Sequence, residues 1–225
     1  MTLQIKICGI TNRDDACVVQ KCGADYMGII VDIAGSRRAV TAEAAAEISA
    51  GIEKIVLVMD GPVMEIARAL RRVQPNAVQL IGHRPLSSLQ KLKQASAGTQ
   101  VWQTVHVPRN GDRTCHDLSQ HISRLQQAGL DAIVLDTLVP GVKGGTGQTC
   151  DWDAAAALVR SSPLPVFLAG GLNHENVARA IAAVKPAGVD VSSGVEIGPG
   201  RKDPQKVSFF MQQARSASDV LNKTA

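Results

Sequence analysis

Two side chains with acid–base chemistry stand at the ends of short apolar runs. Cys8 follows Ile5-Lys-Ile, and Asp136 follows Ala-Ile-Val-Leu. A thiol beside the N–H groups that begin a helix favours its thiolate form and can remove a proton. A carboxyl group held against an apolar wall can keep its proton near neutral pH and act as an acid. We therefore consider Cys8 as a base and Asp136 as an acid, although a core cysteine and an Asx turn would leave the same pattern.

Three glycine-rich stretches follow in order along the second half of the chain. They are Gly141-Val-Lys-Gly-Gly-Thr-Gly147, Ala169-Gly-Gly-Leu172 and Ser192-Ser-Gly-Val-Glu196. Glycine lets backbone N–H groups approach a ligand closely, as a phosphate site requires. One such stretch alone is a flexible loop, but three in succession predict a phosphate-binding site.

Other polar residues extend this candidate site. Arg37 and Arg38 follow the second apolar run, where a guanidinium group can pair with a substrate carboxylate, or where the two form a solvated basic loop. Gln79 ends another apolar run. The five histidines show no metal-ligand spacing, so we expect no metal.

The elements that must position these residues alternate between two periodicities. Helical spacing of apolar residues separates short β-rich runs, a pattern that predicts parallel strands joined by helices. The predicted helices include 42–48, 63–73, 118–125, 154–159 and 177–184. The eight predicted strands are 5–8, 26–31, 55–59, 77–80, 101–105, 132–135, 166–169 and 188–191.

Eight such units form either a closed (β/α)8 TIM barrel or an open doubly wound sheet. The dinucleotide-binding motif of open sheets is missing after the first strand, where Cys8-Gly-Ile-Thr stands instead. We therefore predict one α/β domain, a (β/α)8 barrel over residues 1–225. Polar residues at the carboxyl ends of its strands would converge on one mouth.

The composition of the chain limits the classes of molecule that it is expected to bind. A net charge of +4, with few aromatic residues, does not favour nucleic-acid binding, and no apolar stretch approaches membrane-spanning length. The five cysteines lack disulfide-framework spacing, which predicts a reducing cytoplasm. We expect a small phosphorylated substrate and a monomer or homodimer.

Several of these motifs together resemble the phosphoribosylanthranilate isomerase family. The resemblance spans nearly the whole chain and includes a closing motif before the last helix. The matching motifs are Lys6-Ile-Cys-Gly-Ile-Thr11, Val78-Gln-Leu80, Gly144-Gly-Thr-Gly147, Ala169-Gly-Gly-Leu-Asn173, Asp190-Val-Ser-Ser-Gly-Val-Glu196 and Gly200-Arg-Lys-Asp203.

The resemblance implies a cofactor-free Amadori rearrangement in tryptophan biosynthesis. It assigns the general base to Cys8 and the general acid to Asp136. It also implies that Arg38 meets the anthranilate carboxylate and that Lys6 and Gln79 bind substrate. The phosphate would be held by backbone groups of Gly145, Thr146, Gly170, Gly171, Ser193 and Gly194.

Two departures from the family pattern lie where the aromatic end of the substrate would bind. The stretch 31–39 lacks the family's aromatic residues, and Ile81 stands where the family has histidine. Two alternatives therefore stay open: a paralogous barrel isomerase for another phosphorylated amino-sugar, and a catalytically silent barrel that binds phosphorylated metabolites.

Overall fold

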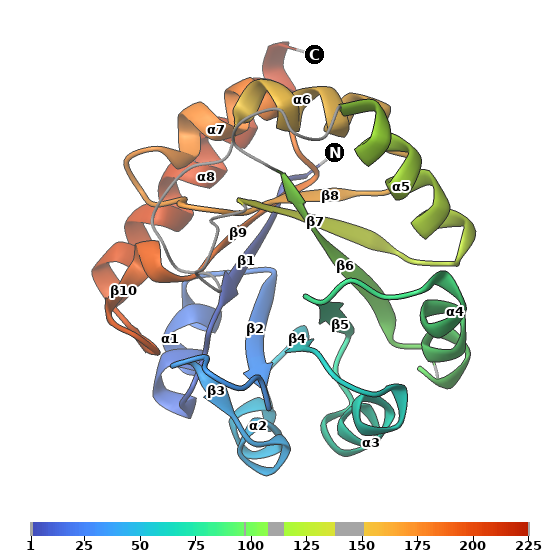
Figure 1. Ribbon diagram of the computed structural model, residues 1–225. Coiled ribbons are helices and arrows are strands. Elements are labelled where there is room, and N and C mark those ends of the chain that lie inside the picture. Colours follow the sequence, from blue (N-terminus) through green and yellow to red (C-terminus); the bar gives the residue numbers. More distant parts are fainter. Residues whose placement is uncertain (1, 97, 108–114, 138–150, 225) are drawn as a thin grey trace.

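The computed structural model describes residues 2–96, 98–107, 115–137 and 151–224. Eight parallel strands form a closed barrel inside a ring of helices (Figure 1). Pairing of β1 with both β2 and β9 closes the barrel. The barrel strands are β1 (Gln4–Cys8), β2 (Tyr26–Val31), β4 (Ile55–Met59), β5 (Ala77–Leu80), β6 (Gln100–Val107), β7 (Ala132–Thr137), β8 (Val166–Leu168) and β9 (Gly188–Val191).

Helices follow the barrel strands and cover their outer face (Figure 1). Thr41 and Asp151 cap two of them: Thr41 accepts one hydrogen bond from a backbone N–H group of the first turn, and Asp151 accepts two. The helices are α1 (Arg13–Lys21), α2 (Ala42–Ser49), α3 (Val63–Val73), α4 (Leu86–Ala95), α5 (Cys115–Gln127), α6 (Trp152–Ser161), α7 (Val177–Val184) and α8 (Pro204–Thr224).

The predicted barrel is confirmed, and all eight predicted strands are present within a few residues. The structure adds short elements that the sequence did not predict. β3 (Ala39–Val40) pairs with β2, and β10 (Glu196–Gly198) pairs antiparallel with β11 (Arg201–Lys202). A 3-10 turn, η1 (Ser193–Val195), precedes this hairpin. Runs of two or three residues are too short to show a period, which explains the omission.

Alternation along each strand divides the core into an outer and an inner part. The outer part packs Ile5, Ile7 and their counterparts against the helices. Inside the barrel, Tyr26, Trp102 and Phe167 pack ring against ring toward the amino-terminal ends of the strands. Polar side chains occupy inward positions farther along the strands, so the barrel interior changes character from one end to the other.

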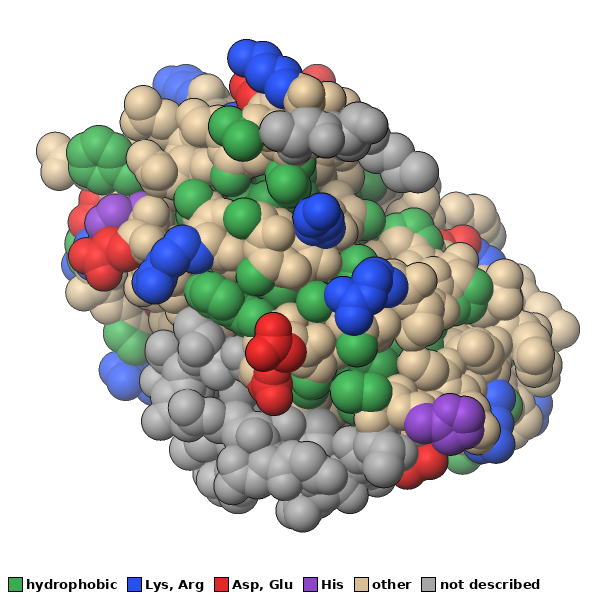
Figure 2. Space-filling view, turned by 90° about the horizontal axis from the view of Figure 1, so that it is seen from above, with side chains coloured by type: hydrophobic (Ala, Val, Ile, Leu, Met, Phe, Trp, Pro, Cys, Tyr) green, Lys and Arg blue, Asp and Glu red, His purple; other side chains and the backbone are tan. Residues whose placement is uncertain are grey.

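Charged side chains are scattered over the face of the molecule shown in Figure 2. Lys and Arg side chains lie apart from one another there, with acidic side chains nearby. No helix within the described ranges is both long and apolar enough to cross a membrane.

Candidate active site

The predicted base and acid lie at the same end of the barrel. Cys8 ends β1, and Asp136 is the penultimate residue of β7, so each is near the carboxyl end of its strand. The parallel register of β6 and β7 places His106 beside Asp136. Residues opposite each other in register point to the same face of a sheet, and Val134, two residues before Asp136, packs with Trp102 inside the barrel, so alternation places Asp136 and His106 on the inner face.

Cys8 is enclosed by neighbouring strands, with 8% of its surface exposed. Burial raises the pKa of its thiol, while the positive charges of Lys6 and Lys202 oppose that rise. Gly28 on β2 leaves room for the sulfur, since a Cβ there would lie 2.7 Å from Cys8 Sγ. The thiol is therefore a buried group whose proton affinity depends on nearby cations.

Lys6 lies inside the barrel and is fully buried. Its side chain is 0% exposed, and Nζ donates a hydrogen bond to Asp190 on β9 at 2.8 Å. Burial lowers the pKa of Lys6, but the adjacent Asp190 carboxylate outweighs burial and raises it above the usual value. A positive charge thus lies two residues before Cys8, on the same face of β1. Direct contact between Lys6 and a substrate stays a prediction.

The second and third glycine stretches lie beside the ends of β8 and β9. Gly170 and Gly171 have φ values of +87° and +63°, a left-handed conformation that favours glycine. Asn176 holds this loop by donating to the Gly171 carbonyl at 2.9 Å. No described residue accepts a hydrogen bond from the backbone N–H of Gly171, Ser193 or Gly194. These amides are available donors for an anion.

The loop after β9 has no room for a side chain at Gly194. A Cβ on Gly194 would lie 2.0 Å from the Leu172 carbonyl oxygen, so the two glycine loops meet at this point. Gly145 and Thr146, the predicted phosphate contacts of the first stretch, lie outside the described residues.

Arg38 forms a forked ion pair within the protein. Its Nε and Nη2 donate to the Glu196 carboxylate at 2.9 Å and 2.7 Å. Hydrogen bonding to Glu196 raises the pKa of Arg38, so the guanidinium keeps its charge. The sequence predicted this fork toward a substrate carboxylate, and that contact stays a prediction.

Gln79 is buried and points into the barrel from β5. Its Nε2 donates to Thr104 at 3.0 Å, whereas no described residue pairs with its buried Oε1.

Beside Cys8, a small apolar cluster contains Ile33 and Val58, with Ile30 and Ile81 packed against it. Ile33 from the stretch 31–39 and Ile81, the two departures from the family pattern, thus both lie in the cluster around Cys8.

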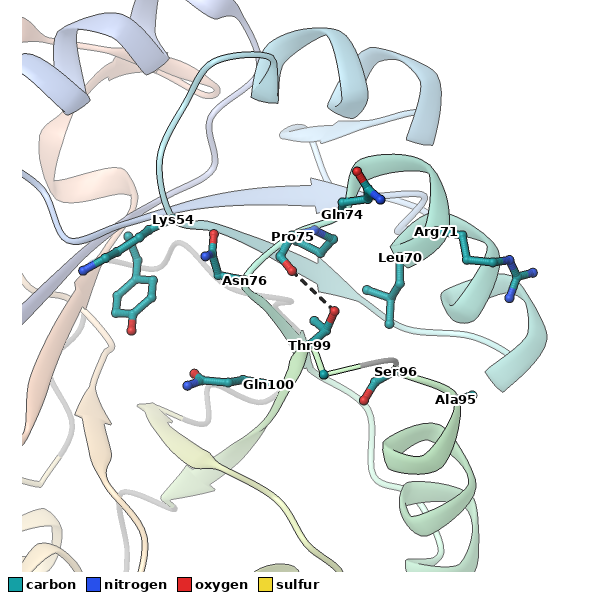
Figure 3. A pocket seen from close by; sticks show the side chains of 12 residues that line it. Lys54, Leu70, Arg71, Gln74, Pro75, Asn76, Ala95, Ser96, Thr99 and Gln100 are labelled. Carbon is teal, nitrogen blue, oxygen red and sulfur yellow. Dashed lines mark hydrogen bonds between the residues drawn. The ribbon is translucent and has the colours of Figure 1, made fainter.

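A separate pocket of about 570 Å³ opens at the opposite end of the barrel (Figure 3). Lys54, Asn76 and Gln100, which line it, lie at the amino-terminal ends of β4, β5 and β6. This pocket therefore lies away from Cys8 and Asp136, and we do not identify it with the active site.

Three charged residues near Cys8 were not singled out from the sequence. Asp190 pairs with Lys6, and Lys202 pairs with Glu196 at 2.8 Å. A charged residue inside the apolar run 188–191 was a readable signal for Asp190, since burying an unpaired carboxylate is costly. Within the part of the chain that the structure describes, no three His, Cys, Asp or Glu side chains gather as a metal site requires.

Comparison with known proteins identifies one enzyme family. A family model described as N-(5'phosphoribosyl)anthranilate (PRA) isomerase matches residues 5–213. The N-(5'-phosphoribosyl)anthranilate isomerase of Methanocella arvoryzae is 36% identical over 216 residues, covering 94% of this chain and 98% of that protein.

Solved structures agree in fold and in family. The phosphoribosyl anthranilate isomerase of Thermotoga maritima superposes with a TM-score of 0.82 at 34% identity, covering 96% of this chain and 100% of that one. Another phosphoribosyl anthranilate isomerase, in complex with reduced 1-(o-carboxyphenylamino)-1-deoxyribulose 5-phosphate, has a TM-score of 0.78 at 31% identity, with the same coverage. The chain belongs to the N-(5'-phosphoribosyl)anthranilate isomerase family.

Proposed function

We propose that this chain catalyses the Amadori rearrangement of N-(5'-phosphoribosyl)anthranilate to 1-(2-carboxyphenylamino)-1-deoxyribulose 5-phosphate, a step of tryptophan biosynthesis. The observation that carries this proposal is the position of Cys8 and Asp136 at one barrel mouth, beside glycine loops with available backbone amides. Family membership supplies the substrate.

The reaction divides into a ring opening and a proton shift. Asp136 donates its proton to the ribose ring oxygen as the bond from that oxygen to C1 breaks, and the anilino nitrogen lone pair forms a C1=N Schiff base. The Cys8 thiolate then removes the proton at C2. The C2–H electrons form a C1=C2 bond and the C1=N electrons return to nitrogen, giving an enolamine. Loss of the C2 hydroxyl proton and protonation at C1 give the ketone.

The charges around Cys8 suit a base that forms in a buried site. Burial raises the pKa of the thiol and makes its thiolate a stronger proton acceptor. Lys6 stabilises the thiolate once it forms, and Asp190 keeps Lys6 charged at 2.8 Å. We therefore assign Lys6 an electrostatic role toward Cys8, beside the substrate contact that the family pattern implies for it.

Phosphate recognition is assigned to main-chain amides. Gly170, Gly171, Ser193 and Gly194 would hold the phosphate through their backbone N–H groups. Gly145 and Thr146 remain part of this proposal. Anchoring the phosphate would orient C2 of the sugar toward Cys8.

The aromatic end of the substrate would lie against the apolar cluster near Cys8. Ile30, Ile33, Val58 and Ile81 offer an aliphatic wall that can pack against an aryl ring. Arg38 keeps its charge beside Glu196, and its guanidinium can bind the anthranilate carboxylate through the edge that Glu196 does not occupy.

Several expectations belong to the same proposal. We propose one catalytic domain over residues 1–225, a small phosphorylated substrate, a cytoplasmic location and a monomer or homodimer. A related structure is that of monomers generated from the dimeric phosphoribosylanthranilate isomerase of Thermotoga maritima, so size-exclusion chromatography with light scattering is the appropriate measurement of assembly.

The direct test follows the loss of substrate fluorescence with wild type, Cys8→Ala and Asp136→Asn. We expect wild-type turnover and a loss of about 100-fold or more in each variant, in line with general acid–base contributions. Cys17→Ser on α1 and the exposed Asp153→Asn on α6 are matched controls that should keep wild-type rates.

The outcomes separate the alternatives. Absence of wild-type turnover would overturn the isomerase proposal. If inorganic phosphate then still raised the melting temperature, a barrel for another phosphorylated amino-sugar or a silent binding barrel would take its place.

A further inference from the structure

Lys202 lies at the centre of a buried polar network behind the candidate base. Its side chain is 0% exposed, and its Nζ donates three hydrogen bonds. The acceptors are the Cys8 carbonyl at 2.6 Å, Glu196 Oε1 at 2.8 Å and the Ser192 carbonyl at 3.3 Å. An ammonium group has three donors, so all of them are used inside the protein.

These three acceptors belong to three parts of the candidate site. Cys8 is the residue whose thiol is the proposed base, and Ser192 begins the proposed phosphate loop. Glu196 also holds Arg38 in a forked ion pair. One buried cation therefore connects groups that are proposed to contact the reacting carbon, the phosphate and the carboxylate of a single substrate.

The hairpin that carries Lys202 is fixed to the start of the chain. Asp15 Oδ2 accepts a hydrogen bond from the Lys202 backbone N–H at 2.8 Å, and Thr11 Oγ1 donates to the Gly200 carbonyl at 2.5 Å. The loop after β1 is also close to the network, since a Cβ on Gly9 would lie 2.7 Å from Arg38 Cδ and 2.8 Å from Ser192 Oγ. These contacts leave Lys202 little freedom to move.

We propose that Lys202, held by Glu196, is a positioning residue that fixes Cys8 relative to the phosphate loop and supplies positive charge behind the thiol. This inference rests on the proposed function of Cys8 as the base. A small displacement of a base from the reacting carbon can lower a rate about 100-fold, so a geometric role predicts a loss in kcat.

The charge of Lys202 adds a second, electrostatic consequence. The charged groups around Cys8 are Lys6 on its own strand, Asp190 on β9, Lys202 on β11, and the Arg38–Glu196 pair. Lys202 lowers the pKa of Cys8, and Asp190 raises it. Removing the Lys202 charge should therefore move the thiol's titration to higher pH.

The experiment compares Lys202→Met with Lys206→Met across a pH series. Lys206 on α8 is a matched control, because its Nζ donates to the Glu196 carbonyl at 2.9 Å and braces the same hairpin without a hydrogen bond to Cys8. We expect Lys202→Met to lower kcat about 100-fold with little change in KM. We also expect its rising pH limb to move up by about one pH unit. Lys206→Met should keep the wild-type limb.

A readout independent of turnover separates this inference from the proposed function. Mass spectrometry of the Cys8 peptide gives the rate of iodoacetamide labelling at each pH, and the same upward shift is expected there. Lys202→Gln keeps a hydrogen-bond donor without the charge and serves if Lys202→Met does not fold. An unchanged labelling limb in the folded variant, or equal kcat losses in the Lys202 and Lys206 variants, would overturn the positioning role.

Discussion

At the amino-terminal end of the barrel Tyr26, Trp102 and Phe167 pack ring against ring, whereas toward the carboxyl-terminal end Cys8 lies near a buried Lys6–Asp190 ion pair. The Trp102 and Phe167 rings stack with centroids 4.7 Å apart. Aromatic packing of this kind stabilises the fold, while buried charges are stable only as long as each keeps its partner. From this difference we infer that stability and chemistry are carried by different layers of the same eight strands.

Breaking the buried ion pair should have the largest effect, because it acts on both stability and turnover. Lys6→Met leaves the Asp190 carboxylate buried without its cation, which costs about 3–5 kcal/mol of unfolding free energy. Urea unfolding measures this loss. The double variant Lys6→Met/Asp190→Leu should recover much of the stability but not the turnover. Recovery of both would contradict a catalytic role for the pair.

Truncating the aromatic layer should affect stability without changing the chemistry. Phe167→Ala leaves a cavity beside Trp102 and Tyr26 and should cost about 3 kcal/mol. The kcat per folded molecule should stay at the wild-type value. Urea unfolding combined with active-site titration checks this separation, and a fall in kcat comparable to that of an acid or base variant would argue against it.

A substitution in the proposed phosphate loop should act on binding. Gly194→Ala forces its Cβ against the Leu172 carbonyl and displaces the adjacent amides. Loss of one charge-assisted hydrogen bond of about 1.5–3 kcal/mol corresponds to a rise in KM of about 10–100-fold. Gly198→Ala, where an added Cβ meets nothing within 4 Å, is the control. Equal KM values in the two variants would contradict the proposal that this loop binds the substrate phosphate.

The smallest effect concerns the pH dependence of stability near Glu196. Burial raises the pKa of Glu196, but Arg38 and Lys202 outweigh burial and lower it below 4.5. Its stabilising contribution is therefore present above the unfolded-state pKa and is lost as pH falls through the folded-state pKa. Below pH 4.5 the wild type should lose unfolding free energy more steeply than Glu196→Gln, by at most about 1.4 kcal/mol per pH unit. Identical slopes in denaturant titrations would exclude this contribution.

The strands and the positions of the proposed acid and base were within reach of sequence analysis, whereas the contacts between distant elements were not. Apolar runs mark the barrel strands, and Cys8 and Asp136 end such runs. Arg38 was predicted to form a forked pair with a substrate carboxylate, whereas its forked pair with Glu196, 158 residues away, was not predicted. Lys202 meets Cys8 across 194 residues, and no local periodicity encodes that contact.

The direction of the Lys6 side chain can be predicted from strand alternation alone. Lys6 and Cys8 are two residues apart on one strand and therefore face the same side. This spacing indicates that Lys6 points into the barrel, below the mouth. The identity of its partner required the register of β1 with β9, which pairs Lys6 with Asp190.

The central claim is that a thiolate at the barrel mouth removes the proton at C2 of the sugar. Single-turnover kinetics with substrate deuterated at C2, for wild type and Cys8→Ala, tests it most directly. We predict a primary isotope effect on wild-type product formation and a rate at least about 100-fold lower in the folded variant. A folded Cys8→Ala enzyme that forms product at the wild-type rate would contradict the account.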